Sequence, residues 1–127
     1  MLPKPGKRVP GPYYDLEAFK AEVRADNVHV YRTRAVDIIR SLLNCSRDAA
    51  TEFAKRAVLS LKAEDYAHTL EVWGGQSQDV YGLLIEGTGW YLKIEIHVDD
   101  GEPGIVSCHP AEYDLRTRRG MVPGARK

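Results

Sequence analysis

The chain has 127 residues, with 18 Lys and Arg against 18 Asp and Glu, so its formal net charge is zero. This length fits one domain that buries a core without metal or disulfide staples, and the balanced charge argues against a surface devoted to polyanions. No apolar run approaches the ~18 residues of a membrane-spanning helix. No apolar segment follows the basic N-terminus, and the two unclustered cysteines are expected as reduced thiols, so the sequence predicts a cytoplasmic protein.

The N-terminal half of the chain predicts an arm followed by helices. Residues 1–12 contain four prolines and two glycines, which is typical of a flexible extended arm. Apolar residues at helical spacing then predict three helices. Their expected ranges and caps are 16–25 after Asp15, 34–44 after Thr33, and Ser46 to about Ser60, with a short strand-like segment at 28–31 between the first two.

The C-terminal half changes to the period-two pattern of strands. Four strands are expected, at 65–73, 78–85, 90–98 and 105–109, joined by turns that include a tight GTG hairpin at 87–89. Helices that precede a meander of strands are typical of an α+β fold, in which the helices pack on one face of a mainly antiparallel sheet. We expect one domain over residues 13–115 and a basic C-terminal tail over 116–127.

One face of the strand at 90–98 carries groups that can transfer protons. Leu92, Ile94, Ile96 and Val98 alternate with Tyr91, Lys93, Glu95 and His97. The apolar set is expected to meet the helices. Of the polar set, Tyr91 and Lys93 are expected to line the open face, whereas Glu95 and His97 are interpreted as plain exposed positions.

Five residues together fit cleavage of RNA by its own 2′-hydroxyl. This reaction needs a base for the hydroxyl proton, an acid for the 5′-oxygen and groups that stabilise the charged phosphorane. Histidine suits the proton transfers because its pKa lies near neutral pH. Tyr, Lys and Gln can position the phosphate. The candidate residues are His68, Gln78, Tyr91, Lys93 and His109.

Other kinds of site fit the sequence less well. The histidines and acids show no metal-binding spacing, so neither a metal nor another cofactor is expected. Cys108 is interpreted as a small buried residue that points away from His109, because adjacent strand residues face opposite sides. Three arginines after the last strand, Arg116, Arg118 and Arg119, are candidates for contact with nucleic-acid phosphates, although as a solvated tail they would only aid solubility.

Several segments resemble the MqsR (motility quorum-sensing regulator) toxins. They are GPYYDLEAFKAEV, LKAEDYAHTL, QDVYG, GWYLKIEI and IVSCH, and they span about Tyr13 to His109. The resemblance implies a RelE-like fold and the function of a type II toxin, an mRNA endoribonuclease neutralised by a cognate antitoxin. It also implies RNA, with or without the ribosome, as the substrate.

The resemblance assigns roles unevenly to residues of this chain. The motif glutamine falls on Gln78 and the strand tyrosine on Tyr91. His68 and His109 stand where the family commonly has lysines, and Ser77 stands where the family has tryptophan. We therefore expect His68 and His109 as the acid/base pair, with Gln78, Tyr91 and Lys93 at the phosphate.

Two other interpretations remain open at this point. The first is a non-catalytic module on the same fold that binds RNA, the ribosome or another protein. The second is an unrelated α+β domain with a polar sheet face. The second interpretation would be favoured if His68, Gln78, Tyr91 and His109 lay far apart in space.

Overall fold

The computed structural model describes residues 6–126, and within them the chain forms an α+β fold. Its main sheet has six strands in the order β1-β3-β4-β5-β6-β2, all antiparallel except the β2–β6 pair. The strand bounds are β1 Lys7–Val9, β2 His29–Val30, β3 Tyr66–Val72, β4 Gln76–Ile85, β5 Thr88–Ile96 and β6 Pro103–Pro110. The α+β class expected from the sequence is confirmed.

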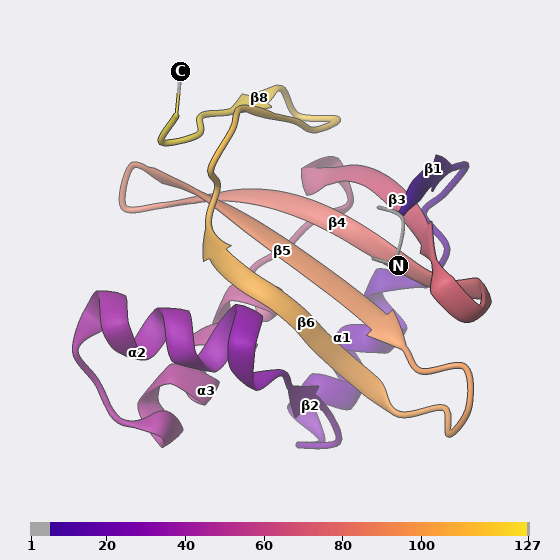
Figure 1. The fold of residues 1–127 in the computed structure, drawn as a ribbon, viewed down its shortest axis with the longest axis horizontal. Helices are drawn as coiled ribbons and strands as arrows, with labels where there is room; N and C mark the ends of the chain where they lie inside the picture. The colour runs from indigo at the N-terminus through magenta and orange to yellow at the C-terminus, as the bar shows by residue number, and fades with distance from the viewer. Residues whose placement is uncertain (1–5, 127) are drawn as a thin grey trace, which may run out of the picture.

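All the helices lie on one side of this sheet (Figure 1). Their bounds are α1 Leu16–Arg24, α2 Asp37–Leu43 and α3 Arg47–Leu59. Asp15 and Ser46 cap α1 and α3 through their side chains, as expected. The expected cap at Thr33 is wrong, because a π-helical turn, Arg32–Val36, follows Tyr31 and leads directly into α2.

The principal core fills the space between the helices and the sheet. Helix residues such as Phe19, Ile39 and Val58 pack against the apolar sheet residues Leu92 and Ile94. Ile96 packs against the edge of this core, whereas Val98 lies beyond the end of β5 and is exposed. The predicted inward face of this strand is therefore confirmed up to Ile96.

A second, smaller core lies on the opposite face of the sheet. The C-terminal segment forms a hairpin of β7, Leu115–Arg116, and β8, Met121–Val122, seen in yellow above the sheet in Figure 1. Leu115 and Val122 pack there against Val80 of β4. Part of the segment expected as a basic tail is thus folded onto the domain. The expected N-terminal arm also differs, since β1 pairs with β3, and residues 1–5 lie outside the described residues.

The β4–β5 hairpin sets the register of the candidate site. Its turn consists of Glu86 and Gly87, whose φ values are 50° and 81°. Positive φ at both central residues suits the right-handed twist of a two-residue hairpin. The turn lies one residue before the expected GTG turn, and it pairs Ile85 with Thr88.

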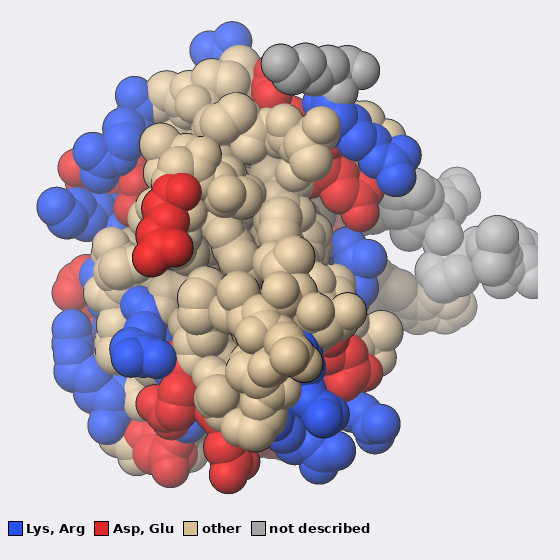
Figure 2. All heavy atoms as spheres, turned by 90° about the vertical axis from the view of Figure 1, so that its left-hand side faces the viewer, with Lys and Arg blue, Asp and Glu red and all other residues tan. Residues whose placement is uncertain are grey.

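The charges of the described residues are spread over the surface. Figure 2 shows Lys and Arg interspersed with Asp and Glu around an uncharged middle on the face that it presents. This matches the zero net charge of the chain. None of the described helices is both long enough and apolar enough to cross a bilayer.

Candidate functional site

The candidate site lies on the sheet face opposite the helices, beside the C-terminal hairpin. Four residues form one row across the sheet from β3 to β6. In this row His68 pairs with Val80, Val80 with Lys93, and Lys93 with Ser107. Tyr91 and His109 form the next pair on β5 and β6. Their rings stack with centroids 5.1 Å apart and planes at 15°.

The partners of His109 fix its tautomer. Its Nδ1 lies 2.9 Å from the carbonyl oxygen of Pro110, which can only accept, so Nδ1 carries the hydrogen. Its Nε2 lies 3.1 Å from Nη2 of Arg34, and a guanidinium can only donate. The neutral ring therefore presents its lone pair at Nε2, where Arg34 covers it. Arg34 comes from the π-helical turn before α2 and reaches over β6.

Both candidate histidines are held neutral by their surroundings. Burial is the main cause, and for His68 the charges of Arg8 and Lys93 add to it, lowering the pKa to about 4. The pKa of His109 is lowered by burial, with smaller contributions from Arg34 and Lys93, against the hydrogen bond to Pro110. A bound phosphate would act in the opposite direction, because a nearby negative charge favours the protonated ring.

Lys93 and Tyr91 lie between the two histidines. The Nζ atom of Lys93 is 5.8 Å from the centre of the Tyr91 ring. Burial raises the pKa of Tyr91 and lowers that of Lys93, and the charge of Arg34 lowers both. Arg8, Arg34 and Lys93 thus supply three cationic groups around one half-buried patch, which is the environment that attracts a phosphate.

The two histidines are not in contact with each other. His68 is on β3 and His109 on β6, with β4 and β5 between them, so their backbones are separated by three strand spacings, roughly 14 Å across the sheet. The structure therefore brings Tyr91, Lys93 and His109 together and places His68 on the far side of Lys93. All of them face the same side of the sheet.

Gln78 lies at the other end of this face, in contact with a buried carboxylate. Its Nε2 donates to Oε1 of Glu95 at 2.8 Å, and the Tyr31 hydroxyl donates to Oε2 of Glu95 at 2.7 Å. The interpretation of Glu95 as a plain exposed residue is wrong, because only 3% of it is accessible. Position alone did not reveal this burial, which depends on Tyr31 reaching across from the segment after β2.

The other residues of the QDVY segment have structural contacts. Asp79 is fully buried on the helix side, where its carboxylate accepts from the backbone nitrogens of Tyr13 and Tyr14 and from the Thr69 hydroxyl. Tyr81 packs in the principal core. Because side chains alternate along β4, Asp79 and Tyr81 point to the helix side of the sheet and Gln78 points to the open face.

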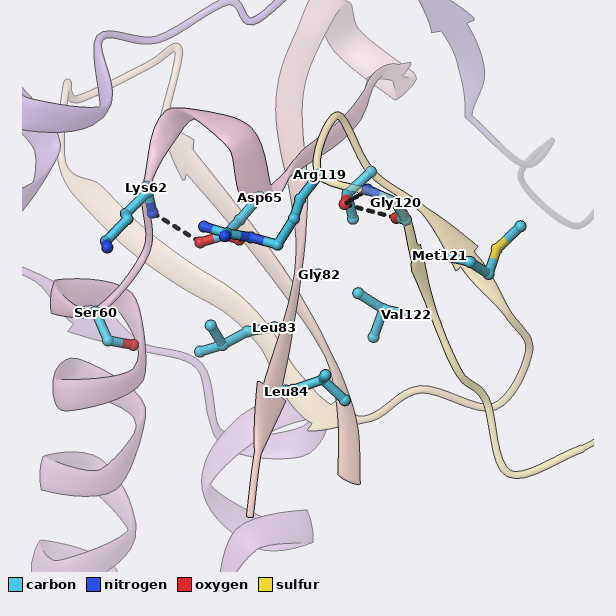
Figure 3. A pocket seen from close by; sticks show the side chains of 11 residues that line it. Ser60, Lys62, Asp65, Gly82, Leu83, Leu84, Arg119, Gly120, Met121 and Val122 are labelled. Atoms are coloured by element: carbon cyan, nitrogen blue, oxygen red, sulfur yellow. Dashed lines mark hydrogen bonds and ion pairs between the residues drawn. The ribbon is translucent and has the colours of Figure 1, made fainter. Parts of the chain in front are cut away.

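Two of the three arginines that follow the last strand, Arg118 and Arg119, make contacts away from the histidines, and Arg116 is exposed in β7. Arg119 makes ion pairs with Asp65 at 3.0 Å and Glu64 at 3.4 Å, and Figure 3 shows it alongside Asp65 at the wall of a separate pocket. Arg118 lies 4.8 Å from the ring centre of Tyr66, and its charge lowers the pKa of Tyr81 in the helix-side core. The arginines whose charges lower pKa values at the site are instead Arg8 and Arg34.

Comparison of the chain with models of known protein families and with curated proteins finds no match. The resemblance to the MqsR toxins therefore depends on the quoted segments alone.

Other reactive groups lie apart from the site. Cys108 is fully buried in the principal core, with burial raising the pKa of its thiol to about 12, and it points away from His109 as expected. Cys45 is partly buried and also free. Among the described residues, no three His, Cys, Asp or Glu side chains are grouped so that they could hold a metal.

Sequence reasoning missed Arg8, Arg34, Glu95 and Tyr31. The contact of Glu95 with Gln78 does have a signal in the sequence. A two-residue turn at Glu86 and Gly87 pairs residues that are equally far from the turn along the chain, and this pairing places Glu95 opposite Gln78. Arg8 and Arg34 lie in an edge strand and a helical turn. No local pattern of the sequence indicates that these segments pass beside β3 and β6.

Proposed function

We propose that this protein is an endoribonuclease that cleaves RNA through attack of the 2′-hydroxyl on the adjacent phosphate, as the toxin of a type II toxin–antitoxin pair. The observation that carries the proposal is the stacked Tyr91–His109 pair with Arg34 and Lys93 beside it and His68 beyond. These side chains can supply the proton transfers and the positive charge that the reaction requires. The resemblance to MqsR toxins supports the same assignment.

The separation of the histidines suits an in-line displacement. In this geometry the attacking 2′-oxygen and the leaving 5′-oxygen lie on opposite sides of the phosphorus, so the base and the acid must flank the phosphate. A phosphate held over Lys93 and Tyr91 would have His109 on one side and His68 on the other. Lys93 and Arg34 would stabilise the charge that develops on the non-bridging oxygens.

His109 is the better candidate for the general base. Its neutral ring has a lone pair at Nε2, which becomes free when Arg34 moves to the phosphate. The 2′-oxygen then gives its proton to Nε2 and bonds to phosphorus. The bond from phosphorus to the 5′-oxygen breaks, and the 5′-oxygen takes a proton from His68, whose pKa the phosphate raises from its low value in the free protein. The products are a 2′,3′-cyclic phosphate and a 5′-hydroxyl.

Incubation of a mixed-sequence mRNA with purified protein in EDTA tests the proposal. Wild type is expected to give products with 2′,3′-cyclic phosphate ends, and His109→Ala to cleave about 10²- to 10⁴-fold more slowly, because a general acid or base contributes about that factor. His29→Ala is the matched control, since His29 is exposed in the edge strand β2. Absence of cleavage by wild type on any RNA would refute the nuclease.

One observation favours a second candidate function, a module that binds RNA without cleaving it. Arg34 occupies Nε2 of His109, and His68 has a pKa of about 4, so neither histidine is ready to donate a proton in the free protein. Tight RNA binding by wild type with no product, and harmless expression at high level in bacteria, would favour this candidate. Growth arrest that His68→Ala relieves would favour the nuclease.

The toxin proposal implies a cytoplasmic antitoxin. We expect it to cover the open sheet face, because a partner there would bury the partly exposed Tyr91 and Lys93 and keep RNA from the site. Co-expression with the product of the neighbouring reading frame, followed by co-purification, tests this partner. His109→Ala is expected to bind it as wild type does, since the substitution leaves most of the face intact.

A further inference from the structure

A polar pocket of about 330 Å³ adjoins the row of candidate residues. Its volume lies at the lower end of the roughly 300–1,000 Å³ of small-molecule sites. It shares Gln78 with the candidate site, so a molecule whose phosphate lies over Lys93 can extend into it along the same sheet face. The residues that matter for its chemistry are Tyr31, Trp73, Gln76, Gln78, Glu95 and His97.

Trp73 forms an exposed aromatic wall of this pocket. The indole is 81% accessible and follows the end of β3. It begins a short turn in which Gly74 and Gly75 have φ values of 79° and 75°, and this left-handed backbone favours glycine. An indole held in water offers a flat surface on which a nucleobase can stack, which is the usual way that proteins hold single-stranded RNA.

Glu95 defines which chemical groups the pocket accepts. Each of its oxygens receives one hydrogen bond, from Gln78 or from Tyr31, and each retains a further lone pair. A carboxylate only accepts, so a ligand beside it must donate. Its negative charge repels a phosphate, and Asp99 at the rim adds to the repulsion. The pocket therefore suits an uncharged ring with N–H groups.

The neighbouring amide of Gln76 is already committed to the fold. Its Nε2 donates to the carbonyl oxygens of Ser77 and Ile96, and its Oε1 accepts from the backbone nitrogen of Val98. These contacts tie the start of β4 to the end of β5. Gln76 thus forms a rigid end of the pocket, and its amide is already occupied by the fold.

We propose that this pocket is a nucleobase subsite, which stacks one base of the RNA on Trp73 and accepts a hydrogen bond from its amino group at Glu95. Adenine, cytosine and guanine each carry an exocyclic amino group, whereas the one donor at the edge of uracil, N3–H, is flanked by two carbonyl oxygens that the carboxylate repels. The subsite therefore favours the three amino-bearing bases over uracil. This inference rests on the proposed function in so far as RNA is the ligand.

The test uses RNA hexamers with 2′-O-methyl groups, which can bind but cannot be cleaved by 2′-hydroxyl attack. One hexamer is all uridine, and three others carry a single A, C or G at the third position. Fluorescence anisotropy of labelled hexamers is expected to give wild type about tenfold tighter binding of the amino-bearing hexamers, as about 1.4 kcal/mol of discrimination would produce. Equal affinities within twofold would overturn the proposal.

Substitutions separate the two parts of the pocket. Glu95→Gln is expected to reduce the discrimination to about threefold or less, because glutamine can both donate and accept, while Glu86→Gln, the same change at an exposed residue of the β4–β5 turn, is expected to leave the discrimination unchanged. Trp73→Ala is expected to weaken the binding of every hexamer about tenfold, as the loss of one stacked base would. Tyr113→Ala, a change at another exposed aromatic residue, is expected to weaken the binding of none. Full discrimination in a folded Glu95→Gln protein would overturn the proposal.

Tryptophan fluorescence gives an independent readout. The chain has two tryptophans, and Trp90 is 3% accessible and packs on Phe53, so quenching by a hexamer reports on Trp73. Binding without quenching would overturn the stacking at Trp73. Cleavage of mRNA by wild type with no base discrimination would refute the subsite and keep the nuclease. Discrimination between hexamers without any cleavage would keep the subsite and refute the nuclease.

Discussion

His109 illustrates how much of the candidate chemistry depends on single atoms. The backbone carbonyl of Pro110 and the guanidinium of Arg34 together determine which ring nitrogen bears the hydrogen. An anion draws Arg34 away from Nε2, because a guanidinium binds a charged oxygen more strongly than a neutral ring nitrogen. A phosphate is such an anion, so RNA binding and the exposure of the base would occur together.

At His68 the expected effect is on stability as a function of pH. Its pKa in the folded protein is about 4, below the ordinary value near 6.5, so the unfolded chain binds the proton first as the pH falls. The neutral ring therefore contributes its full stability above about pH 6.5 and loses it between pH 6.5 and 4. The shift would correspond to ~3 kcal/mol in a dry site, which solvent at the half-buried ring reduces to ~1–2 kcal/mol.

Urea unfolding of wild type and His68→Gln at pH 7.5 and 4.5 measures this contribution. His68→Gln is expected to lose ~1–2 kcal/mol less stability than wild type between the two pH values. The exposed His29 provides a control as His29→Gln, which is expected to follow wild type. Parallel loss of stability in wild type and His68→Gln would contradict the lowered pKa.

At the scale of elements, the C-terminal hairpin and β5 approach each other closely because of a glycine. A Cβ atom placed on Gly89 would lie 2.1 Å from the backbone oxygen of Pro123 and 2.7 Å from Cγ1 of Val122. The first of these atoms belongs to the backbone and cannot rotate away. The residue at this position therefore decides whether β7 and β8 can cover the end of the open face.

Gly89→Ala is expected to displace the hairpin and to destabilise the protein by ~1–3 kcal/mol, as overpacking in a close contact does. Urea unfolding gives the change in stability, and limited proteolysis after Arg116 or Arg119 reports release of the hairpin. Thr88→Ala is the matched control on the adjacent, exposed residue of the same strand. A Gly89→Ala protein as stable and as resistant as Thr88→Ala would show that the hairpin does not depend on this contact.

At the scale of the whole molecule, zero net charge coexists with a cationic patch. Arg8, Arg34 and Lys93 come from β1, the π-helical turn and β5, and they converge only in the folded chain. The face that Figure 2 presents carries mixed charges. RNA is therefore expected to bind through a few phosphates rather than through a broad basic surface.

The dependence of RNA affinity on salt measures how many phosphates are involved. Each contact with single-stranded RNA contributes about −0.7 to the slope of log K against log salt, so three cations predict a slope of about −2. Arg34→Gln is expected to make the slope less steep by about 0.7. Arg116→Gln, at an exposed arginine of β7, is the control and should leave the slope unchanged. A wild-type slope near −6 would mean that much of the surface binds RNA.

The sequence by itself determined the order of helices and strands. The apolar residues that meet the core recur about every 3.6 residues in a helix and every 2 residues in a strand, so their spacing shows which element forms. The sequence therefore predicted the α+β fold, the caps at Asp15 and Ser46, the buried Cys108 and the shared face of Tyr91 and Lys93. The period-two pattern has a limit, since alternate residues share one face of a strand only where the strand pairing is regular. At Ala67 the β3–β4 register shifts, so Tyr66 enters the core while His68 reaches the open face.

Only the tertiary structure decided what surrounds these side chains. Arg8, Tyr31 and Arg34 reach the site because β1 pairs with β3 and β2 pairs with β6, contacts between segments that are distant along the chain. The same folding buries Glu95, ties Arg119 to Asp65, and places two strands between His68 and His109. Long-range packing sets burial and charge at a site, and therefore its pKa values, whereas local pattern sets only which way each side chain points.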